Sequence, residues 1–321
     1  MTGPLVVLMP VYNDWPLIPA LLARLDAAFV GAGLSADVVL ADDGSTVPPE
    51  RSLLDGAGLR AIASVTALHL GRNAGHQRAL AIGLAYIHAT RPGRAVVVMD
   101  ADGEDAAEDV PRLVAALGAG DGGSIVFAGR SARSEGPLFR VFYELYRLTH
   151  RVLTGRRIWF GNFSIVPARL LPRLVLLSEL WNHYPSAVIK ARIPFTSIPL
   201  PRASRLGGRS HMGLTGLILH GLGAISVHGD VIGVRALLAT LVAIVICLSG
   251  IATVVVIRTV TDLAIPGWAS AVVGLLVAIL LQAVLLSLVF IFVTLNSRDY
   301  AAVIPRRDYA DYIAGETRLF P

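Results

Sequence analysis

The sequence predicts an α/β domain with a mostly parallel sheet, followed by a C-terminal region that crosses a membrane. Over the first 130 residues, short apolar runs alternate with helical patterns, as in parallel sheets covered by helices. Farther along, segments 236–257 and 263–297 contain no charged residue. Each exceeds the roughly 20 apolar residues that a helix needs to cross a bilayer. These two segments explain much of the 54% hydrophobic content.

Five apolar runs are expected to form strands, and the segments between them are expected to supply the helices. Strands are expected at 5–9, at 37–41, in a run ending at 70, at 95–99 and at 125–128, and helices at 16–30, 76–89 and 138–153. Polar or glycine residues follow each of these runs. Because an open α/β sheet binds its ligand at the carboxyl ends of its parallel strands, we expect these residues to form a binding site.

The fourth run ends in two carboxylates two positions apart, Asp100 and Asp102. Carboxylates this close repel each other unless a cation lies near them, and a Mg²⁺ or Mn²⁺ ion that also holds a diphosphate would suit them. We therefore expect both residues to be ligands of Mg²⁺ or Mn²⁺. A solvated acidic turn is the alternative, since Asp is common after strands.

The net charge of +5 conceals a change of sign along the chain. Residues 1–129 carry 8 basic and 14 acidic side chains, whereas residues 130–235 carry 15 basic and 4 acidic ones. This distribution favours a cation site in the first part and an anionic phosphate or lipid near the second.

Several protein classes are excluded by what the sequence lacks. Neither Gly-x-Gly-x-x-Gly after the first run nor a Gly-Lys-Ser/Thr phosphate loop occurs, which argues against dinucleotide-binding and P-loop sites.

The first apolar run is too short for a signal peptide, so residues 1–235 are expected to stay on the side of the membrane where they are made. Cys247 is the only cysteine, so no intrachain disulfide can form.

Four motifs, in this order, resemble family 2 glycosyltransferases with the GT-A fold. They are Pro10-Val11-Tyr12-Asn13, Asp42-Asp43-Gly44-Ser45-Thr46, Asn73-Ala74-Gly75 and Asp100-Ala101-Asp102. The chain departs from the family after the last motif, where Gly103-Glu104-Asp105 replaces Leu-Gln-Asp. The resemblance implies a Rossmann-like GT-A catalytic domain that binds a nucleotide-sugar.

The resemblance also implies roles for single residues of these motifs. Tyr12 and Asn13 would line the base pocket, Asp42 or Asp43 would hold the base and ribose, and Asp102 would ligate the metal ion on the diphosphate. The other implied nucleotide-sugar-binding residues are Pro10, Asn73, Gly75 and Asp100. Asp42 could instead cap its turn, and Asn73 could be a turn residue.

Segment 199–212 resembles the Arg-x-x-Gly-x-Ser-Lys-Tyr stretch of polyprenyl-phosphate glycosyltransferases. Arg205, Gly208 and Ser210 match it, and His211 and Met212 replace Lys and Tyr. The residues implied for the acceptor phosphate are Arg205, Arg209, Ser210 and His211, and a guanidinium fork suits a phosphate well. A basic segment attracted to anionic lipid headgroups is the alternative.

Arg130 and Arg140 are two further candidates for positioning the acceptor. The catalytic residues expected are therefore Asp102, Arg130, Arg140 and Arg205. On an ordinary amphipathic helix, however, Arg140 could simply form a surface pair with Glu144.

The expected domains are a GT-A domain at 1–212, an amphipathic juxtamembrane helix at 213–235, two transmembrane helices within 236–295 and a cytoplasmic tail at 296–321. An apolar stripe from Leu214 to Ile225 suits a helix in the membrane interface, although a core helix would show the same pattern. The arginines before and after the two spans place the catalytic domain and both termini in the cytoplasm, at the inner (cytoplasmic) membrane.

The expected function is metal-dependent, inverting transfer of one sugar from a UDP- or GDP-linked donor to a polyprenyl phosphate of the undecaprenyl type. The product would be a lipid-linked monosaccharide for cell-envelope glycan modification. Such a phosphate is already an anionic nucleophile and needs no dedicated base. The expected partners are the nucleotide-sugar, the lipid and the membrane, without nucleic acid, and with a homo-oligomer left open.

Two alternatives stay open at this point. One is a glycosyltransferase acting on a hydroxyl of a glycolipid or saccharide, which would need a base such as Glu104, Asp105 or Glu179. The other is a non-catalytic, membrane-bound scaffold that binds nucleotide-sugars.

Overall fold

A computed structural model describes residues 5–47, 49–50, 53–120, 122–130, 137–156, 160–207, 214–261, 265, 267–299 and 302–321. The chain divides into two compact units. The first comprises residues 1–147, 157–227 and 302–321, and the second comprises residues 148–156 and 228–301.

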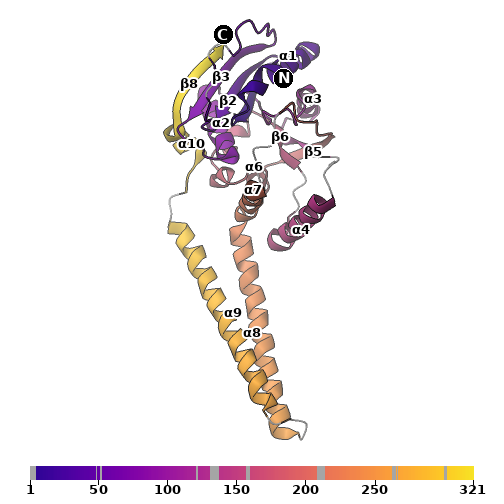
Figure 1. Ribbon diagram of the computed structural model, residues 1–321, viewed down its shortest axis with the longest axis vertical. Coiled ribbons are helices and arrows are strands. Elements are labelled where there is room, and N and C mark those ends of the chain that lie inside the picture. Colours follow the sequence, from indigo (N-terminus) through magenta and orange to yellow (C-terminus); the bar gives the residue numbers. More distant parts are fainter. Residues whose placement is uncertain are drawn as a thin grey trace. The chain divides into compact units, whose positions relative to one another are not determined.

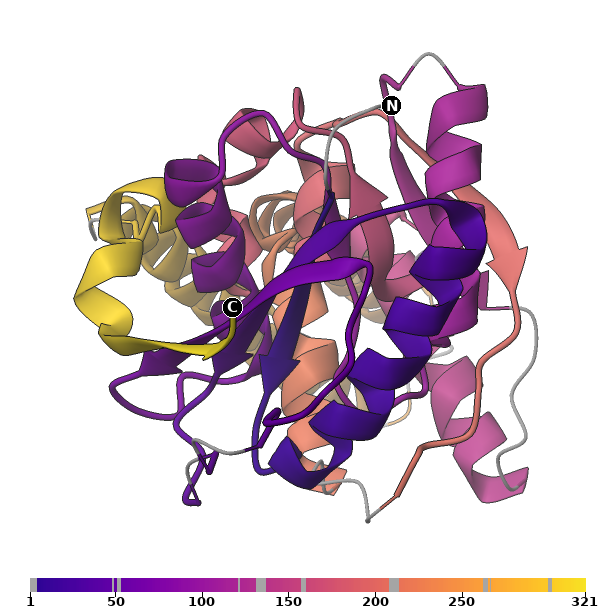
Figure 2. The same cartoon turned by 90° about the horizontal axis from the view of Figure 1, so that it is seen from above.

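The described residues of the first unit form an eight-stranded sheet with the order β7-β5-β6-β4-β1-β2-β3-β8 (Figure 1, Figure 2). The strands are β1 Leu5–Val11, β2 Ala36–Asp42, β3 Ile62–Leu70, β4 Val96–Val98, β5 Ile125–Arg130, β6 Phe160–Val166, β7 Phe195–Leu200 and β8 Ile313–Phe320. Strands β4, β1, β2 and β3 are parallel neighbours, which confirms the expected parallel core. Strand β6 is antiparallel to β4 and β5, and β8 is antiparallel to β3, so the whole sheet is mixed.

Helices cover both faces of this sheet because both faces of its central strands are apolar. Successive strand residues point to opposite faces, so Val7 and Met9 lie in one core with α1 and α3, while Val6 and Leu8 lie in the other with α2, α5 and α6. The helices of this unit include α1 Ile18–Ala32, α2 His76–Thr90, α3 Val110–Ala119, α5 Leu171–Leu174, α6 Tyr184–Lys190, α7 Leu214–Ser226 and α10 Pro305–Asp308. Short 3₁₀ turns lie at Trp15–Leu17, Ala107–Asp109, Ser178–Trp181 and Tyr309–Tyr312. Helix α4, Pro137–Thr154, belongs partly to each unit.

The end of the chain is part of the sheet, which the sequence did not indicate. Residues 313–320, expected to belong to a tail, form β8 and pair with β3 along most of its length. Side chains along β8 alternate between half-buried and exposed. Such a strand at a sheet edge needs few apolar residues, so it carries little sequence signal.

The second unit is built on two helices of 32 residues each, α8 Gly229–Val260 and α9 Trp268–Asp299. By length and composition, both could cross a membrane. They pack against each other, and a Cβ added at Gly250 would lie 3.1 Å from Leu276 Cδ1. Thr240, Cys247 and Val254 are buried at seven-residue spacing, the repeat of helices that coil around each other.

A third segment, Trp15–Ala32, also meets the length and composition of a membrane span. It contains α1, whose residues Leu21, Leu25 and Phe29 are buried in the core beside the sheet. The apolar face of α1 is therefore explained by its packing on the sheet and needs no membrane.

Candidate functional site

Four loops at the carboxyl ends of β1, β2, β3 and β4 form the candidate site. Because these strands are parallel neighbours, residues 12–14, 43–46, 71–75 and 99–105 all follow them at the same edge of the sheet. This is the arrangement that the sequence predicted for its four motifs.

Asp42 and Asp43 are nearly buried, at 4% and 3% exposed, and hold two different loops. Asp42 Oδ1 accepts a hydrogen bond from the Ser45 backbone N–H at 3.0 Å, within its own turn. Asp43 accepts from the backbone N–H groups of Ala74 and Gly75 at 2.6 and 2.9 Å. Burial raises the pKa of Asp43 above its usual value, although these two N–H donors lower it.

The loop after β1 is fixed to the Asp42 turn by Asn13. This residue has a φ of +59°, which is uncommon outside glycine, and its side-chain oxygen accepts from Thr46 N at 2.9 Å. The Asn13 amide oxygen is therefore engaged in joining two loops. Pro10 lies within β1 opposite Ala41, and Tyr12 is partly exposed at the strand end.

Asp100 lies beside a histidine that opens helix α2. Its Oδ1 is buried and accepts no hydrogen bond, and His76 Nε2 lies 3.4 Å away. The same His76 nitrogen is 2.9 Å from Asn162 Nδ2, and Gln77 Nε2 donates to Asn162 Oδ1 at 3.1 Å. Side chains from α2 and β6 thus hold His76 against the acidic loop.

Asp102 lies against Arg205, which comes from the segment after β7. Arg205 donates to Asp102 Oδ2 at 2.9 Å and to Asp14 Oδ1 at 2.6 Å. The pKa of Asp102 is raised to about 6, because burial and then the nearby Asp100 raise it more than Arg205 and Arg202 lower it. The guanidinium expected to bind an acceptor phosphate is thus paired with two carboxylates, one of which is an expected metal ligand.

The whole segment 201–207 lies along the acidic loop 100–105. Backbone N–H groups of Ala203 and Leu206 donate to the carbonyl oxygens of Glu104 and Asp102, both at 3.0 Å. Leu206 packs over Gly103, where an added Cβ would lie 2.4 Å from Leu206 Cγ. Since Gly103 also has a φ of +82°, glycine suits this position on both counts.

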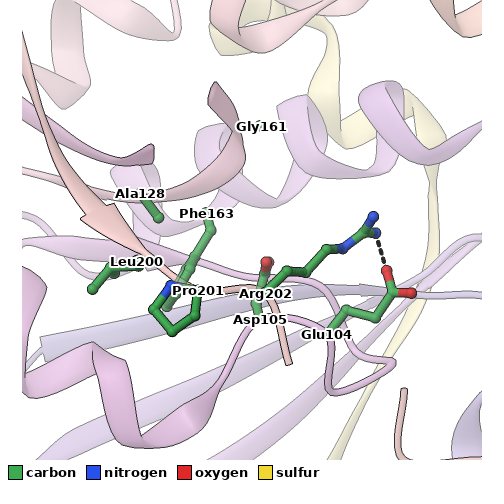
Figure 3. A pocket seen from close by; sticks show the side chains of 8 residues that line it. All are labelled: Glu104, Asp105, Ala128, Gly161, Phe163, Leu200, Pro201 and Arg202. Carbon is green, nitrogen blue, oxygen red and sulfur yellow. Dashed lines mark hydrogen bonds and ion pairs between the residues drawn. The ribbon is translucent and has the colours of Figure 1, made fainter. Parts of the chain in front are cut away.

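A pocket opens between this segment and the end of the sheet (Figure 3). Its lining residues are Glu104, Asp105, Ala128, Gly161, Phe163, Leu200, Pro201 and Arg202. Figure 3 shows the Arg202 side chain extending to Glu104, with which it forms an ion pair. The Asp105 carboxylate accepts from the Asp100 backbone N–H at 2.9 Å.

The structure brings together many of the residues that the sequence singled out. Asp43 contacts Gly75, the next residue His76 faces Asp100, and Asp102 contacts Arg205. Asn73 is exposed at the rim. Arg209, Ser210 and His211 lie outside the described residues, and Arg130 and Arg140 are placed only as positions in β5 and α4.

Sequence reasoning missed the residues that hold the site from elsewhere in the chain. His76, Asn162, Asp14, Arg202 and His69 all contact the acidic residues of the site or the side chains that hold them. His76 directly follows the Asn73-Ala74-Gly75 motif, which was the one available signal for it. Asp14 likewise follows the first motif and Arg202 lies within segment 199–212, whereas the contacts of Asn162 and His69 are recognisable only after folding.

Comparison with known proteins places this site in a family. Residues 6–171 match the family model described as glycosyl transferase family 2. An undecaprenyl-phosphate 4-deoxy-4-formamido-L-arabinose transferase of Klebsiella pneumoniae subsp. pneumoniae is 36% identical over 109 residues, which cover 34% of this chain and 32% of that protein. A protein of the same name from Salmonella paratyphi A is 27% identical over 217 residues, which cover 66% of this chain and 63% of that protein.

Among solved structures, glucosyl-3-phosphoglycerate synthase of M. tuberculosis aligns with a TM-score of 0.49 and 20% identity, covering 72% of this chain and 81% of that one. The chain matches less than two thirds of the length of the two curated relatives. The family model, in contrast, covers more than half of the 321 residues and includes the loops after β1, β2, β3 and β4. The chain therefore belongs to glycosyl transferase family 2.

Proposed function

We propose that this protein is a membrane-anchored glycosyltransferase that moves one sugar from a nucleotide-sugar to a polyprenyl phosphate of the undecaprenyl type. The observation that carries the proposal is the 2.9 Å contact between Arg205 and Asp102. Arg205 belongs to the motif expected to bind the acceptor phosphate, and Asp102 to the motif expected at the donor diphosphate. Their contact supports an acceptor phosphate bound next to the donor.

The donor would lie across the carboxyl ends of β1, β2 and β4. Asp42 and Asp43 are the residues proposed for the base and ribose of a UDP- or GDP-linked donor. The sugar would extend towards the pocket lined by Glu104, Asp105 and Arg202. The rest of its lining is largely apolar, and these three charged side chains could hydrogen-bond to the hydroxyls of a sugar ring.

The two carboxylates after β4 fit a Mg²⁺ or Mn²⁺ ion. Asp100 Oδ1 is buried without a hydrogen bond, and Asp102 Oδ2 already attracts a cation, the guanidinium of Arg205. Within the described residues, no group of three or more His, Cys, Asp or Glu side chains could hold a metal ion. Mg²⁺ commonly takes one or two carboxylates together with substrate phosphates, so the donor diphosphate would complete the site. When bound, the ion would stabilise the charge of the leaving nucleotide diphosphate.

The acceptor side of the site favours a phosphate over a hydroxyl. A hydroxyl acceptor needs a base, and both nearby candidates are engaged, Glu104 with Arg202 and Asp105 with the Asp100 backbone. A phosphate needs cationic positioning instead, for which Arg205 and the basic residues beyond it are suited. Direct attack by that phosphate on the anomeric carbon would invert its configuration.

The names of the curated relatives agree with this acceptor, since each is described as an undecaprenyl-phosphate sugar transferase. Helices α8 and α9 would anchor the chain in the inner membrane, with the catalytic domain and both termini in the cytoplasm. Helix α7 would lie in the interface, because Ile218, Leu219 and Leu222 are exposed by 53%, 62% and 53% while Ala224 is buried.

The proposal is tested with the purified full chain in lipid nanodiscs, undecaprenyl phosphate, Mg²⁺ or Mn²⁺, and a panel of nucleotide-sugars. Mass spectrometry should detect a lipid-linked monosaccharide with one donor and none after chelation of the metal. Failure of the whole panel with undecaprenyl phosphate, together with transfer to a neutral glycolipid, would contradict the proposed acceptor.

A further inference from the structure

The last strand of the chain, β8, contacts the candidate donor site. In the sequence, residues of the second unit lie between β8 and the rest of the first unit. β8 follows residues 228–301 in the chain and pairs with β3 in antiparallel register, with Thr317 opposite Ala67 and Gly315 opposite His69. β3 in turn lies beside β2, which ends at Asp42. This order places the C-terminal residues one strand away from the Asp42 loop.

A histidine connects the C-terminal strand to Asp42. His69 Nδ1 lies 3.0 Å from Asp42 Oδ2, and His69 Nε2 lies 3.1 Å from Thr317 Oγ1. Because a carboxylate oxygen only accepts, Nδ1 carries the proton, and in the neutral ring Nε2 then accepts from the Thr317 hydroxyl. The three side chains form a hydrogen-bonded chain from β8 through β3 to the end of β2.

The same C-terminal segment also holds the loop that packs on the Asp42 turn. The backbone N–H of Gly71 donates to the Tyr312 carbonyl oxygen at 3.0 Å. The next residues lie directly against Gly44, where an added Cβ would be 2.7 Å from the backbone of Arg72 and Asn73. Residues 312–317 therefore contact His69, which holds Asp42, and Gly71, which begins the loop that packs on Gly44.

We propose that β8 contributes to the donor site. Thr317 on β8 and His69 on β3 are positioning residues that orient the Asp42 carboxylate for the nucleotide. The inference rests on the proposed function in one respect, the role of Asp42 as a nucleotide ligand. The Ser45 N–H holds Oδ1 of this carboxylate, and His69 holds Oδ2, so its plane is fixed by a donor on each oxygen. Without His69, Oδ2 loses its hydrogen-bond donor and the carboxylate is free to rotate. Nucleotide binding must then fix its orientation, which lowers the affinity.

The test measures binding of UDP, GDP, CDP and ADP, each with Mg²⁺, to the full chain in nanodiscs by calorimetry. Thr317→Val keeps the shape of the side chain and removes its hydroxyl, whereas Thr317→Ser keeps the hydroxyl. His69→Leu removes both ring nitrogens, and His69→Asn keeps an N–H donor close to the ring Nδ1. Arg318→Ala changes an exposed neighbour on the same strand and serves as the control.

His69→Leu is expected to weaken nucleotide binding by about tenfold and Thr317→Val by a smaller factor, as for partners that orient a ligand-binding group. Thr317→Ser, His69→Asn and Arg318→Ala should bind nearly as tightly as the wild type. With a donor sugar, His69→Leu should raise KM more than it lowers kcat. A melting temperature close to that of the wild type would separate this effect from loss of folding.

Wild-type affinity in both His69→Leu and Thr317→Val would overturn the inference while leaving the proposed function intact. An equal loss in Arg318→Ala would also overturn it, because that loss would reflect the strand as a whole. If the wild type bound none of the four nucleotides, the proposed function itself would fail, and the inference would fail with it.

Discussion

Asp102 is a half-buried carboxylate that forms an ion pair with Arg205 and lies close enough to Asp100 to feel its charge. Its pKa is raised to about 6, with burial as the largest cause, so the folded protein holds this proton more tightly than a free aspartate does. A metal ion binds the ionised form, so proton and metal compete for the same oxygens.

We therefore predict that Mn²⁺ binding in the presence of a nucleotide-sugar weakens as the pH falls through about 6. Arg205→Ala removes a cation that lowers this pKa, so the midpoint should move to higher pH. Electron paramagnetic resonance of free Mn²⁺ measures the effect directly. Equal affinity on both sides of this midpoint would contradict a role for Asp102 as the metal ligand.

Asp26 is a second carboxylate whose charge matters, here for stability. Burial alone would raise its pKa, but the backbone N–H groups of Arg60, Ala61 and Ile62 donate to it at 2.9, 2.7 and 3.0 Å, and the pKa is lowered overall. Its stabilising contribution is therefore present above the unfolded-state pKa of about 3.9 and is lost as the pH falls through the lower, folded-state pKa.

Asp26→Asn should lower the free energy of unfolding by about 1–3 kcal/mol at neutral pH, because hydrogen bonds to a charged group are replaced by weaker ones. The difference from the wild type should shrink as the pH falls below about 4. Denaturant unfolding followed by tryptophan fluorescence measures both. Asp55→Asn, at an exposed position, is the control, and an equal loss there would refute the assignment.

At the scale of elements, segment 201–207 is the part that joins the proposed donor side of the site to the proposed acceptor side. Two backbone hydrogen bonds, two ion pairs and the contact of Leu206 with Gly103 fix it to the loop after β4. Its position decides where Arg205 lies relative to Asp102. Substitutions that displace this segment from the loop after β4 should lower the rate of sugar transfer more than they lower the stability of the fold.

Gly103→Ala tests this segment. The new Cβ would lie 2.4 Å from Leu206 Cγ, so the Leu206 side chain or the segment that carries it must shift. Gly93→Ala is the matched control, because Gly93 also has a positive φ, +80°, but no neighbour lies within 4 Å of its added Cβ.

Both variants should lose about 1–3 kcal/mol of stability to backbone strain. A fall in the rate of sugar transfer beyond that seen in Gly93→Ala is expected only for Gly103→Ala. Equal rates in the two variants, at matched melting temperatures, would show that the segment does not position Arg205.

The elements also show which features the sequence could predict. The loops after β2 and β4 were predictable because an apolar run followed by acidic residues is a local pattern. The contacts that complete the site join residues far apart in the chain: Asp102 and Arg205 differ by 103 in residue number, and His69 and Thr317 differ by 248. Periodicity carries no information about such pairs. For the same reason β8 was expected to be a tail, since an edge strand with alternating polar residues resembles one.

At the scale of the whole molecule, the catalytic unit is assembled from chain segments on both sides of the two apolar helices. If α8 and α9 each cross the membrane once, residues 1–147, 157–227 and 302–321 lie on one side of it, because strands from before and after the two helices share one sheet. The short connection between the helices then lies on the other side.

Ile265→Cys, in a protein whose Cys247 is replaced by alanine, should react in intact cells with a membrane-impermeant maleimide added outside. Ala302→Cys in the same background should react only after the cells are permeabilised. Labelling of both positions, or of neither, in intact cells would contradict two crossings with the catalytic unit in the cytoplasm.

The central claim is that the carboxylates after β4 and the arginine after β7 hold a donor diphosphate next to a lipid phosphate, so that the sugar passes from the first to the second. The most direct measurement compares undecaprenyl phosphate with undecaprenol as acceptors in one nanodisc preparation, with wild type and Asp102→Asn. The account predicts transfer to the phosphate alone, and a rate in Asp102→Asn lower by a factor of about 100 or more. Equal use of the alcohol, or an Asp102→Asn variant as active as the wild type, would contradict it.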